Sequence, residues 1–305
     1  MFDASPNALP PPALQQHPNF IAALRACGQT PLVLDGPAPQ SLLRQTLWRC
    51  LPLAMLVRGA IPSVPHLADS LISAGLRRTP ILISPDHPAP ELAHIGAVAL
   101  VSPASVAEID LRLPVETRRA ALHQKWRNRL TVVDSRLRAN ALRLTRQNMP
   151  IDPNHWLLQA EAQQQRRRGY QSWPAALTLA YAAENPGQAK LFTVFQGRDP
   201  IAAMLFLRHG RGASYHIGHT TARGRAASAH TLLLWHAANW LAAKGHDRLD
   251  LGLINTEDSP GLARFKLGAG AHARALGGTW VWWPPLGRAL RPLAALDRCL
   301  MHTAP

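Results

Sequence analysis

The chain has 305 residues, of which 47% are apolar and 17% are charged, a balance typical of a folded protein and not of a disordered one. Lysine and arginine total 33 against 18 aspartate and glutamate residues, which gives a formal net charge of +15. This excess favours an anionic partner such as RNA, an anionic membrane surface or a phosphate-rich cofactor, without distinguishing among them. The length is sufficient for two domains.

The three cysteines, Cys27, Cys50 and Cys299, have no metal-ligand spacing, and the 14 histidines form no HxxxH cluster in a metal-binding context. These patterns predict a reducing compartment and no metal site. The N-terminus lacks the basic and apolar regions of a secretory signal, and no apolar run is long enough to span a membrane. We therefore expect a soluble, cytoplasmic protein.

Residues 1–20 are rich in proline and polar side chains and are expected to form a flexible N-terminal arm. Apolar segments separated by turn residues follow, and their lengths predict strands with one helix among them. The strands are predicted at residues 31–34, 53–57, 80–85 and 97–101, and the helix at 67–76. Strands that alternate with helices indicate an α/β or α+β layer fold.

From Glu116 to about Gln147 the pattern is helical and very basic, and Pro150 and Pro153 then end it. Further helices are expected at 156–168 and 174–183. We accordingly expect a first domain at 21–150, ending in the basic helix, and a second domain at 151–305.

The second half alternates between strands and helices more clearly than the first. A helix from about Ala226 to Lys244 shows one buried face and is ended by Gly245. Strands are predicted at residues 190–195, 201–208, 213–219, 248–254 and 278–283, and a short helix at 260–268. The tail at 286–301 combines arginines with leucines and is expected either to dock on its own domain or to contact a membrane surface.

The short helix begins at Ser259-Pro260 and ends near Gly268. Ser259 is expected to accept a hydrogen bond from a first-turn N–H group. The helix follows a buried strand and carries Lys266 next to Phe265. Such a cation is suited to hold an anion or a developing negative charge, and the alternative is a capped surface helix with ordinary basic residues, Arg264 among them.

The segment from Thr221 to Ala226 joins the central strand of the second half to the N-terminus of the long helix. Its small residues let a ligand approach the backbone, and free N–H groups together with Arg223 and Arg225 suit a pyrophosphate. An ordinary surface loop is the alternative.

The order of hairpin, central strand, small-residue turn, long helix, strand, short helix and strand resembles the GNAT acyltransferase superfamily. There a Gln/Arg-x-x-Gly-x-Gly/Ala turn holds the pyrophosphate of an acyl-coenzyme A. Gly224-Arg225-Ala226 matches the second half of that turn, whereas Thr221 replaces its leading amide or cationic residue. The residues expected to bind the donor are Thr221, Arg223, Gly224, Arg225 and Ala226.

A closer resemblance covers most of the chain. It rests on Ile109-Asp110-Leu111, the segment from Lys125 to Leu130, the helix around Trp156, and the segment from Gly261 to Gly270. These are similar to the Fem-type peptidoglycan-bridge aminoacyltransferases and to the related BioF2-like acetyltransferase domain. The resemblance implies two GNAT-like domains, each with a mixed central sheet flanked by helices, of which the N-terminal copy is degenerate. It also implies that Lys266 stabilises the transition state of acyl transfer and that Phe265 shapes the site.

An amine acceptor must lose a proton, so a base or a water chain is expected near this helix. Asp250 and Glu257 are the candidate bases, and Asp250 is equally suited to be a structural acceptor. Tyr215 and His219 alternate onto one face of the central strand with Ile217 between them. Tyr215 is predicted to hold the acceptor or donate a proton, with a core aromatic as the alternative, and His216 is predicted to be structural.

The sequence thus predicts an N-acyltransferase that uses acyl-coenzyme A, or alternatively aminoacyl-tRNA, as co-substrate. Its acceptor is expected to be a small-molecule amine or an amine of a cell-wall precursor. The other hypothesis is a non-catalytic GNAT-like basic module that binds RNA or an anionic membrane. The oligomeric state does not follow from the sequence.

Overall fold

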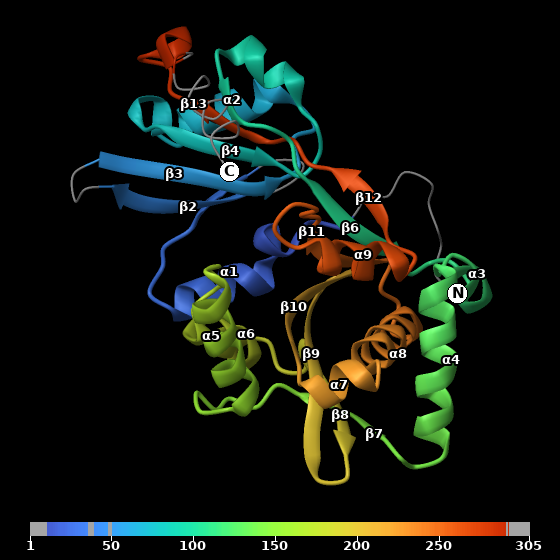
Figure 1. Cartoon of the computed structure of the whole chain (residues 1–305). Helices are drawn as coiled ribbons and strands as arrows, with labels where there is room; N and C mark the ends of the chain where they lie inside the picture. The colour runs from blue at the N-terminus through green and yellow to red at the C-terminus, as the bar shows by residue number, and fades with distance from the viewer. Residues whose placement is uncertain (1–10, 36–39, 48–50, 291, 293–305) are drawn as a thin grey trace.

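The computed structural model describes the chain except for residues 1–10, 36–39, 48–50, 291 and 293–305. Two mixed β-sheets flanked by helices make up the molecule (Figure 1), which confirms the predicted fold class. The first sheet has the order β1-β2-β3-β4-β13-β5 and the second the order β12-β6-β11-β10-β9-β8-β7.

The strands of the first sheet are β1 (Leu32–Leu34), β2 (Gln40–Leu47), β3 (Leu51–Gly59), β4 (Ile81–Pro85), β5 (Val98–Val101) and β13 (Thr279–Trp282). Those of the second sheet are β6 (Ser105–Asp110), β7 (Arg143–Asn148), β8 (Ala189–Gln196), β9 (Asp199–His209), β10 (Gly212–Thr220), β11 (Arg248–Leu253) and β12 (His272–Ala275).

Helices cover both faces of the second sheet. One face packs against α4 (Gln124–Arg138) and α8 (Ala229–Ala243), and the opposite face packs against α1 (Pro18–Ala26), α5 (Trp156–Arg168) and α6 (Ala175–Glu184). The first sheet packs against α2 (Val64–Ser73). The remaining short helices are α3 (Val115–Ala120), α7 (Ala222–Ala226) and α9 (Pro260–Gly268). β9 lies mid-sheet, so its residues from Ile201 to Leu207 are buried from both sides.

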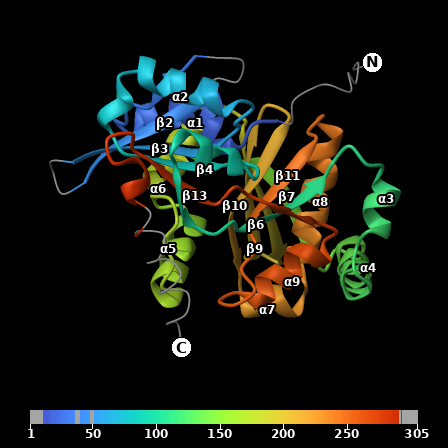
Figure 2. The ribbon, with the colours of Figure 1, turned by 90° about the horizontal axis from the view of Figure 1, so that it is seen from above.

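The two sheets repeat one strand pattern and exchange one strand each. In both, three successive antiparallel strands lead to a parallel pair, which is β3 with β4 in the first sheet and β10 with β11 in the second. β6 then leaves the first half and inserts between β11 and β12, while β13 leaves the second half and inserts between β4 and β5. Figure 2 shows both crossing segments. Each sheet is therefore completed by the other half of the chain.

The predicted domain boundary near residue 150 does not coincide with a division between these sheets. β6, β7 and α4 precede residue 150 but belong to the second sheet and its core, whereas β13 follows it and belongs to the first sheet. The apolar periodicity of a strand identifies its buried face and carries no information about which sheet it joins.

The predicted flexible arm is wrong for the part of it that the structure describes. Leu14 lies in a short 3₁₀ turn (Leu14–Gln16), Phe20 lies in α1, and both are buried in the core that α5 and α6 also line. The Pro11 carbonyl accepts a hydrogen bond of 2.7 Å from Arg248 Nη2. Residues 1–10 lie outside the described chain. The prolines at 10–12 favoured the prediction of a flexible arm, although the same segment contains the apolar residues that anchor it.

Several elements differ from the sequence prediction. β2, β6 and β12 were not predicted, and Arg143–Asn148, predicted as helical, is the edge strand β7. Most of its residues are polar, as is common on a solvated edge, so no apolar alternation marks it. The predicted long helix is confirmed as α8, which begins at Ala229. The turn predicted before it contains the short helix α7, which Ser228, with φ 55°, separates from α8.

Candidate active site

β10 and β11 separate part-way along their length. Their parallel pairing covers three positions, from Gly212 opposite Arg248 to Ser214 opposite Asp250. β10 continues to Thr220 and β11 to Leu253, without further pairing between them. A β-bulge between Tyr215 and Ile217, on the side that pairs with β9, bends β10 at this point. The edges of the two strands beyond the bulge form an opening in the sheet, with backbone N–H and C=O groups that lack ladder partners there.

The bulge changes which side chains of β10 share a face. Tyr215 packs against Phe206 on the α8 side, with a ring-centroid distance of 5.9 Å, whereas Ile217 joins the core on the α5 and α6 side. The ring of His219 lies against Trp156 of α5, at 6.2 Å. The prediction that Tyr215, Ile217 and His219 share one face is therefore wrong, because the extra residue His216 shifts the alternation.

His216 has the structural role predicted for it. Its Nε2 atom lies 2.7 Å from Thr178 Oγ1, and its ring packs on Trp173 at 4.7 Å. Burial lowers the pKa of His216 to about 4, so the imidazole is neutral in the folded protein at neutral pH.

Tyr215 extends along β10 over Gly218. A Cβ atom at position 218 would lie 1.9 Å from the Tyr215 hydroxyl oxygen, so a larger residue there would displace this ring. Burial raises the pKa of Tyr215 well above its ordinary value. The phenol therefore stays protonated and is able to donate a hydrogen bond.

Lys266 is buried at the end of β11. Its side chain extends from α9, and Nζ donates a hydrogen bond of 2.7 Å to the Leu253 carbonyl. Burial lowers the pKa of Lys266 to about 8, and the negative charge of Asp250 partly opposes this shift. An ammonium group has three N–H donors, so two remain for another acceptor. Lys266 thus places a cation on the β11 side of the opening.

Phe265 connects the helices around this opening. Its ring lies 5.8 Å from Trp126 of α4 and 6.2 Å from His230 of α8. His230 Nε2 in turn lies 2.8 Å from the His219 carbonyl oxygen on β10. The structure therefore brings the basic-helix segment around Trp126 and the Phe265-Lys266 pair, 139 positions apart, into contact.

α9 has the predicted bounds but not the predicted N-cap. It begins at Pro260 and ends at Gly268, and the Ser259 side chain makes no capping hydrogen bond. The Ser259 carbonyl oxygen accepts from the N–H groups of Leu262 and Ala263. Arg264 is exposed, in agreement with a solvated surface charge.

Both carboxylate oxygens of Asp250 are engaged. Oδ2 accepts 2.9 Å from Arg58 Nη2, and Oδ1 accepts 2.7 Å from the Gly252 N–H group. These contacts match the structural alternative for Asp250. Glu257, the other candidate base, is exposed in the loop between β11 and α9. Arg58 could not be connected with this site from the sequence, since it follows an ordinary apolar strand of the first half.

The predicted donor-binding segment is the short helix α7 at the carboxyl end of β10. Thr221 caps it, since Oγ1 accepts 3.1 Å from the Gly224 N–H group and donates 3.1 Å to the Ile201 carbonyl. A Cβ atom at Gly224 would lie 2.2 Å from the Ile201 carbonyl oxygen, so only glycine fits there. Ala226 is the last residue of α7.

The two arginines of α7 are exposed and each has one polar contact. Arg223 forms an ion pair with Asp199 at 2.8 Å, and Arg225 Nη1 donates 3.0 Å to the Thr220 carbonyl. Both guanidinium groups therefore keep donors for a further anion.

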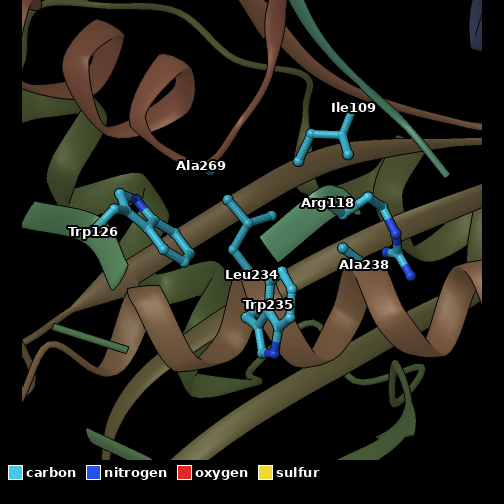
Figure 3. A pocket seen from close by; sticks show the side chains of 7 residues that line it. All are labelled: Ile109, Arg118, Trp126, Leu234, Trp235, Ala238 and Ala269. Carbon is cyan, nitrogen blue, oxygen red and sulfur yellow. The ribbon is translucent and has the colours of Figure 1, made fainter. Parts of the chain in front are cut away.

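Two cavities lie away from these residues. The first, shown in Figure 3, has a volume of about 10 Å³, enough for one water molecule. It is lined by Ile109, Arg118, Trp126, Leu234, Trp235, Ala238 and Ala269. The second is an open groove of about 440 Å³ between α8 and the β7–β8 edge, lined by Leu144, Thr145, Arg146, Phe192, His236, Asn239 and Trp240. Of the site residues described above, only Trp126 lines one of these cavities.

Residues 118–267 match the model of the acetyltransferase (GNAT) domain. The chain carries a GNAT domain. This GNAT domain runs from α3 into α9 and includes the opening between β10 and β11, α7 and the Phe265-Lys266 pair.

Solved structures share the fold of the whole chain. FemX superposes with a TM-score of 0.74 at 12% identity, covering 92% of this chain and 95% of FemX. The C-terminal domain of a protein classed as a lysylphosphatidylglycerol synthetase from Agrobacterium fabrum gives 0.56 at 12% identity, covering 94% of this chain and 93% of that domain. L-PGS from Bacillus licheniformis gives 0.54 at 10% identity, covering 97% and 99%. No curated protein matches the sequence.

None of the helices in the described residues is long and apolar enough to cross a membrane. The likeness to these solved structures extends beyond the GNAT domain into the first sheet, which the family model does not reach.

Proposed function

We propose that this GNAT domain is an N-acyltransferase that moves an acyl or aminoacyl group from an activated donor to an amine. The observation that carries the proposal is the opening between β10 and β11 with the buried Lys266 ammonium at its β11 side. An opening in the sheet offers backbone donors and acceptors for an extended substrate, and the cation offers a partner for the charge that develops during transfer.

In the proposed reaction the neutral acceptor amine attacks the carbonyl carbon of the donor. The carbonyl oxygen becomes an oxyanion, towards which Lys266 directs the N–H groups not used by the Leu253 carbonyl. By analogy with loss of one oxyanion-hole donor, this contact contributes about 3 kcal/mol to transition-state stabilisation. The tetrahedral intermediate collapses, the bond from carbon to the leaving group breaks, and the amine nitrogen loses its proton to water or to the departing group. Tyr215, protonated at neutral pH, is suited to donate to the leaving group.

Acyl-coenzyme A is the first proposed donor. Its pantetheine arm would occupy the opening between the strands, and its phosphates would lie at α7 near Arg223 and Arg225. The support is the position of α7 at the carboxyl end of β10 and the exposure of both arginines. The Thr221 hydroxyl, already engaged within α7, contributes to the shape of this helix and not to phosphate binding.

Aminoacyl-tRNA is the second proposed donor, and the groove beside α8 favours it. The cations of Arg146, Lys190 and Arg208 lie 4.7, 5.8 and 5.2 Å from the Trp240 ring, and none of the three forms an ion pair with a carboxylate among the described residues. An unneutralised basic surface of this kind binds the phosphates of a nucleic acid. The names of FemX and of the lysylphosphatidylglycerol synthetase direct the search for an acceptor to cell-wall precursors and lipids.

The deciding experiment measures equilibrium binding of acetyl-coenzyme A, charged tRNA and uncharged tRNA, together with transfer to a panel of amines detected by mass spectrometry. Transfer from acetyl-coenzyme A, with binding weakened in Arg225→Gln and unchanged in Arg211→Gln, supports the first donor. Arg211 is also exposed, and its partner is Asp247. Transfer from charged tRNA alone, weakened in Arg146→Gln, supports the second. Tight RNA binding without transfer from any donor overturns the enzyme and supports the non-catalytic module.

A further inference from the structure

Arg58 adopts an unusual backbone conformation at the end of β3. Its φ of 56° lies in the left-handed region, which a residue with a long side chain seldom occupies. The register between β3 and β4 shifts at the same place, where Val57 pairs with Ser84 and Gly59 with Pro85. Arg58 is thus the extra residue of a bulge, a device that redirects a side chain. Backbone outliers of this kind persist where the surrounding structure holds them, commonly at functional sites.

The redirected side chain crosses from the first sheet to the second. Arg58 Nη2 donates 2.9 Å to Asp250 Oδ2 on β11, and Nε donates to Asp86, which follows β4. The side chains of Arg58 and Asp250 are only 12% and 11% exposed, so the pair is nearly removed from water. A buried pair of this kind is specific in geometry, because breaking it leaves an uncompensated charge.

Arg58 belongs to a larger network between the sheets. Arg248 and Arg274 approach Glu108 and Asp86 at distances between 2.8 and 3.8 Å. Within the described residues, however, Asp250 forms its ion pair with Arg58 and with no other arginine. The orientation of Asp250 therefore depends on Arg58, while the rest of the network joins the sheets through other carboxylates.

Asp250 in turn shapes the surroundings of Lys266. Its Oδ1 atom holds the Gly252 N–H group at 2.7 Å, where Gly252 has φ 78°, and the next carbonyl, that of Leu253, accepts from Lys266 Nζ at 2.7 Å. Asp250 is also the charged group that acts on the Lys266 ammonium, while the nearby rings on α4 and α8 are those of Trp126 and His230, both in contact with Phe265. Burial lowers the pKa of His230, so its ring is neutral near pH 7.

We propose that Arg58, supplied by the first sheet, is a positioning residue for the transferase site: it fixes the Asp250 carboxylate and thereby the place and charge of the Lys266 ammonium. The first half of the chain then completes the site of the GNAT domain through this one side chain. The proposal rests on the proposed role of Lys266 in acyl transfer.

The geometry predicts opposite effects on Lys266 for the two partners. In Arg58→Gln the Asp250 charge is no longer shared with a guanidinium, so it acts fully on Lys266 and the pKa of Lys266 rises by roughly one unit. In Asp250→Asn the negative charge is absent while an amide oxygen can still accept from Gly252, so the pKa of Lys266 falls by roughly one unit. Arg58→Lys keeps a cation beside Asp250 and is expected to leave the pKa close to the wild-type value.

The chain permits a direct measurement, because it contains four lysines, Lys125, Lys190, Lys244 and Lys266. Competitive acetylation of the full-length protein across pH, followed by mass spectrometry of the lysine peptides, yields the pKa of Lys266 with the other three as internal references. Arg274→Gln is the matched control, since it breaks the pairs with Glu108 and Asp86 but leaves Arg58 on Asp250. Its effect on the Lys266 pKa should be less than half that of Arg58→Gln.

An unchanged Lys266 pKa in folded Arg58→Gln, or equal shifts in Arg58→Gln and Arg274→Gln, overturns the proposal. If Arg58→Gln does not fold, Asp250→Asn and Arg58→Lys still test the proposal. A shift of the Lys266 pKa in Arg58→Lys as large as that in Asp250→Asn contradicts it. Once a transfer assay is established, kcat should fall roughly tenfold in Arg58→Gln and recover in Arg58→Lys, with KM for the donor little changed. Labelling shifts that appear while Lys266→Ala retains full turnover would disprove the proposed role of Lys266 in acyl transfer and leave the coupling of Arg58 to Lys266 intact.

Discussion

The parallel pair of the first sheet stays closed, whereas that of the second opens. β3 and β4 pair from Ala54 opposite Ile81 to Gly59 opposite Pro85, across the bulge at Arg58. β10 and β11 pair at three positions and then separate, although β10 runs on to Thr220. The same strand order thus produces a closed sheet in one half and an opening in the other.

Lysine content differs between the two regions as well. All four lysines of the chain follow residue 124, so β1 to β5 contain none. The first sheet instead contributes Arg58, whose guanidinium reaches Asp250 on β11 of the second sheet. The same strand pattern therefore has a different role in each half. The second sheet contains the opening, beside which α9 buries the Lys266 ammonium, and the first sheet supplies Arg58, which holds Asp250 near it.

The exchange of strands predicts the largest effect, at a residue outside the GNAT domain. Trp282 of β13 is 2% exposed, and its Nε1 donates 3.1 Å to the Ile95 carbonyl in the first sheet's core. Trp282→Ala should destabilise the first sheet by about 3–5 kcal/mol, because a large cavity replaces the ring. Hydrogen exchange should show lost protection in β4 and β5 and retained protection in β9. Trp283→Ala, at a more exposed ring, is the control. Equal protection of β4 in both variants would contradict the role of β13 in completing the first sheet.

The buried ammonium predicts the next largest effect. Lys266→Ala should lower the transfer rate by about 10²–10³-fold with the fold retained, because the oxyanion loses its cationic donor. The measurement is single-turnover transfer with the donor identified in the binding experiments. Lys244→Ala removes an exposed lysine and should leave the rate unchanged. Full activity of Lys266→Ala would show that the Lys266 ammonium takes no part in the mechanism.

The close approach of α7 to β9 predicts an intermediate effect. In Gly224→Ala the new Cβ atom would meet the Ile201 carbonyl oxygen at 2.2 Å and Thr220 Oγ1 at 2.5 Å, so backbone must move. We expect a loss of about 1–3 kcal/mol in the free energy of unfolding and weaker donor binding. Gly261→Ala, where nothing lies within 4 Å, is the matched control for chemical denaturation. Equal stability of the two variants would show that the close approach of Gly224 to the Ile201 carbonyl does not require glycine.

The smallest predicted effect is on pH dependence. The pKa of Lys266 in the folded protein is about 8, below the ordinary 10.5, so the ammonium is present below that pH and is lost as the pH rises through it. Transfer that needs the cation should decline by about tenfold per pH unit above this value. Lys266→Arg, whose guanidinium does not titrate in this range, should remove the alkaline decline even if its rate is lower. A decline that persists in Lys266→Arg would assign it to another group.

The sequence predicted the elements whose signal is local. The α9 bounds, the β10 and β11 strands, and the pairing of Phe265 with Lys266 all lie within short windows where caps and alternation are visible. β7 and β12 were missed because exposed strands leave little apolar pattern, and α7 was predicted as a turn because five residues are too few to show a helical period. Within β10 itself, the alternation of Tyr215 with His219 failed because a bulge has no periodic signature.

The site shows the same division. Lys266 and α7 could be proposed from motifs, but the engagement of Asp250 by Arg58 could not, since the two residues are 192 positions apart. The sequence by itself determined the fold class, the basic character and the residues of the GNAT domain that could carry acyl transfer. Only the tertiary structure decided that the strands of each half complete the opposite sheet, that β10 parts from β11, and that Arg58 of the first sheet pairs with Asp250 of the second. These depend on long-range pairing and on side chains that meet across sheets, which local propensity and hydrophobic periodicity do not encode.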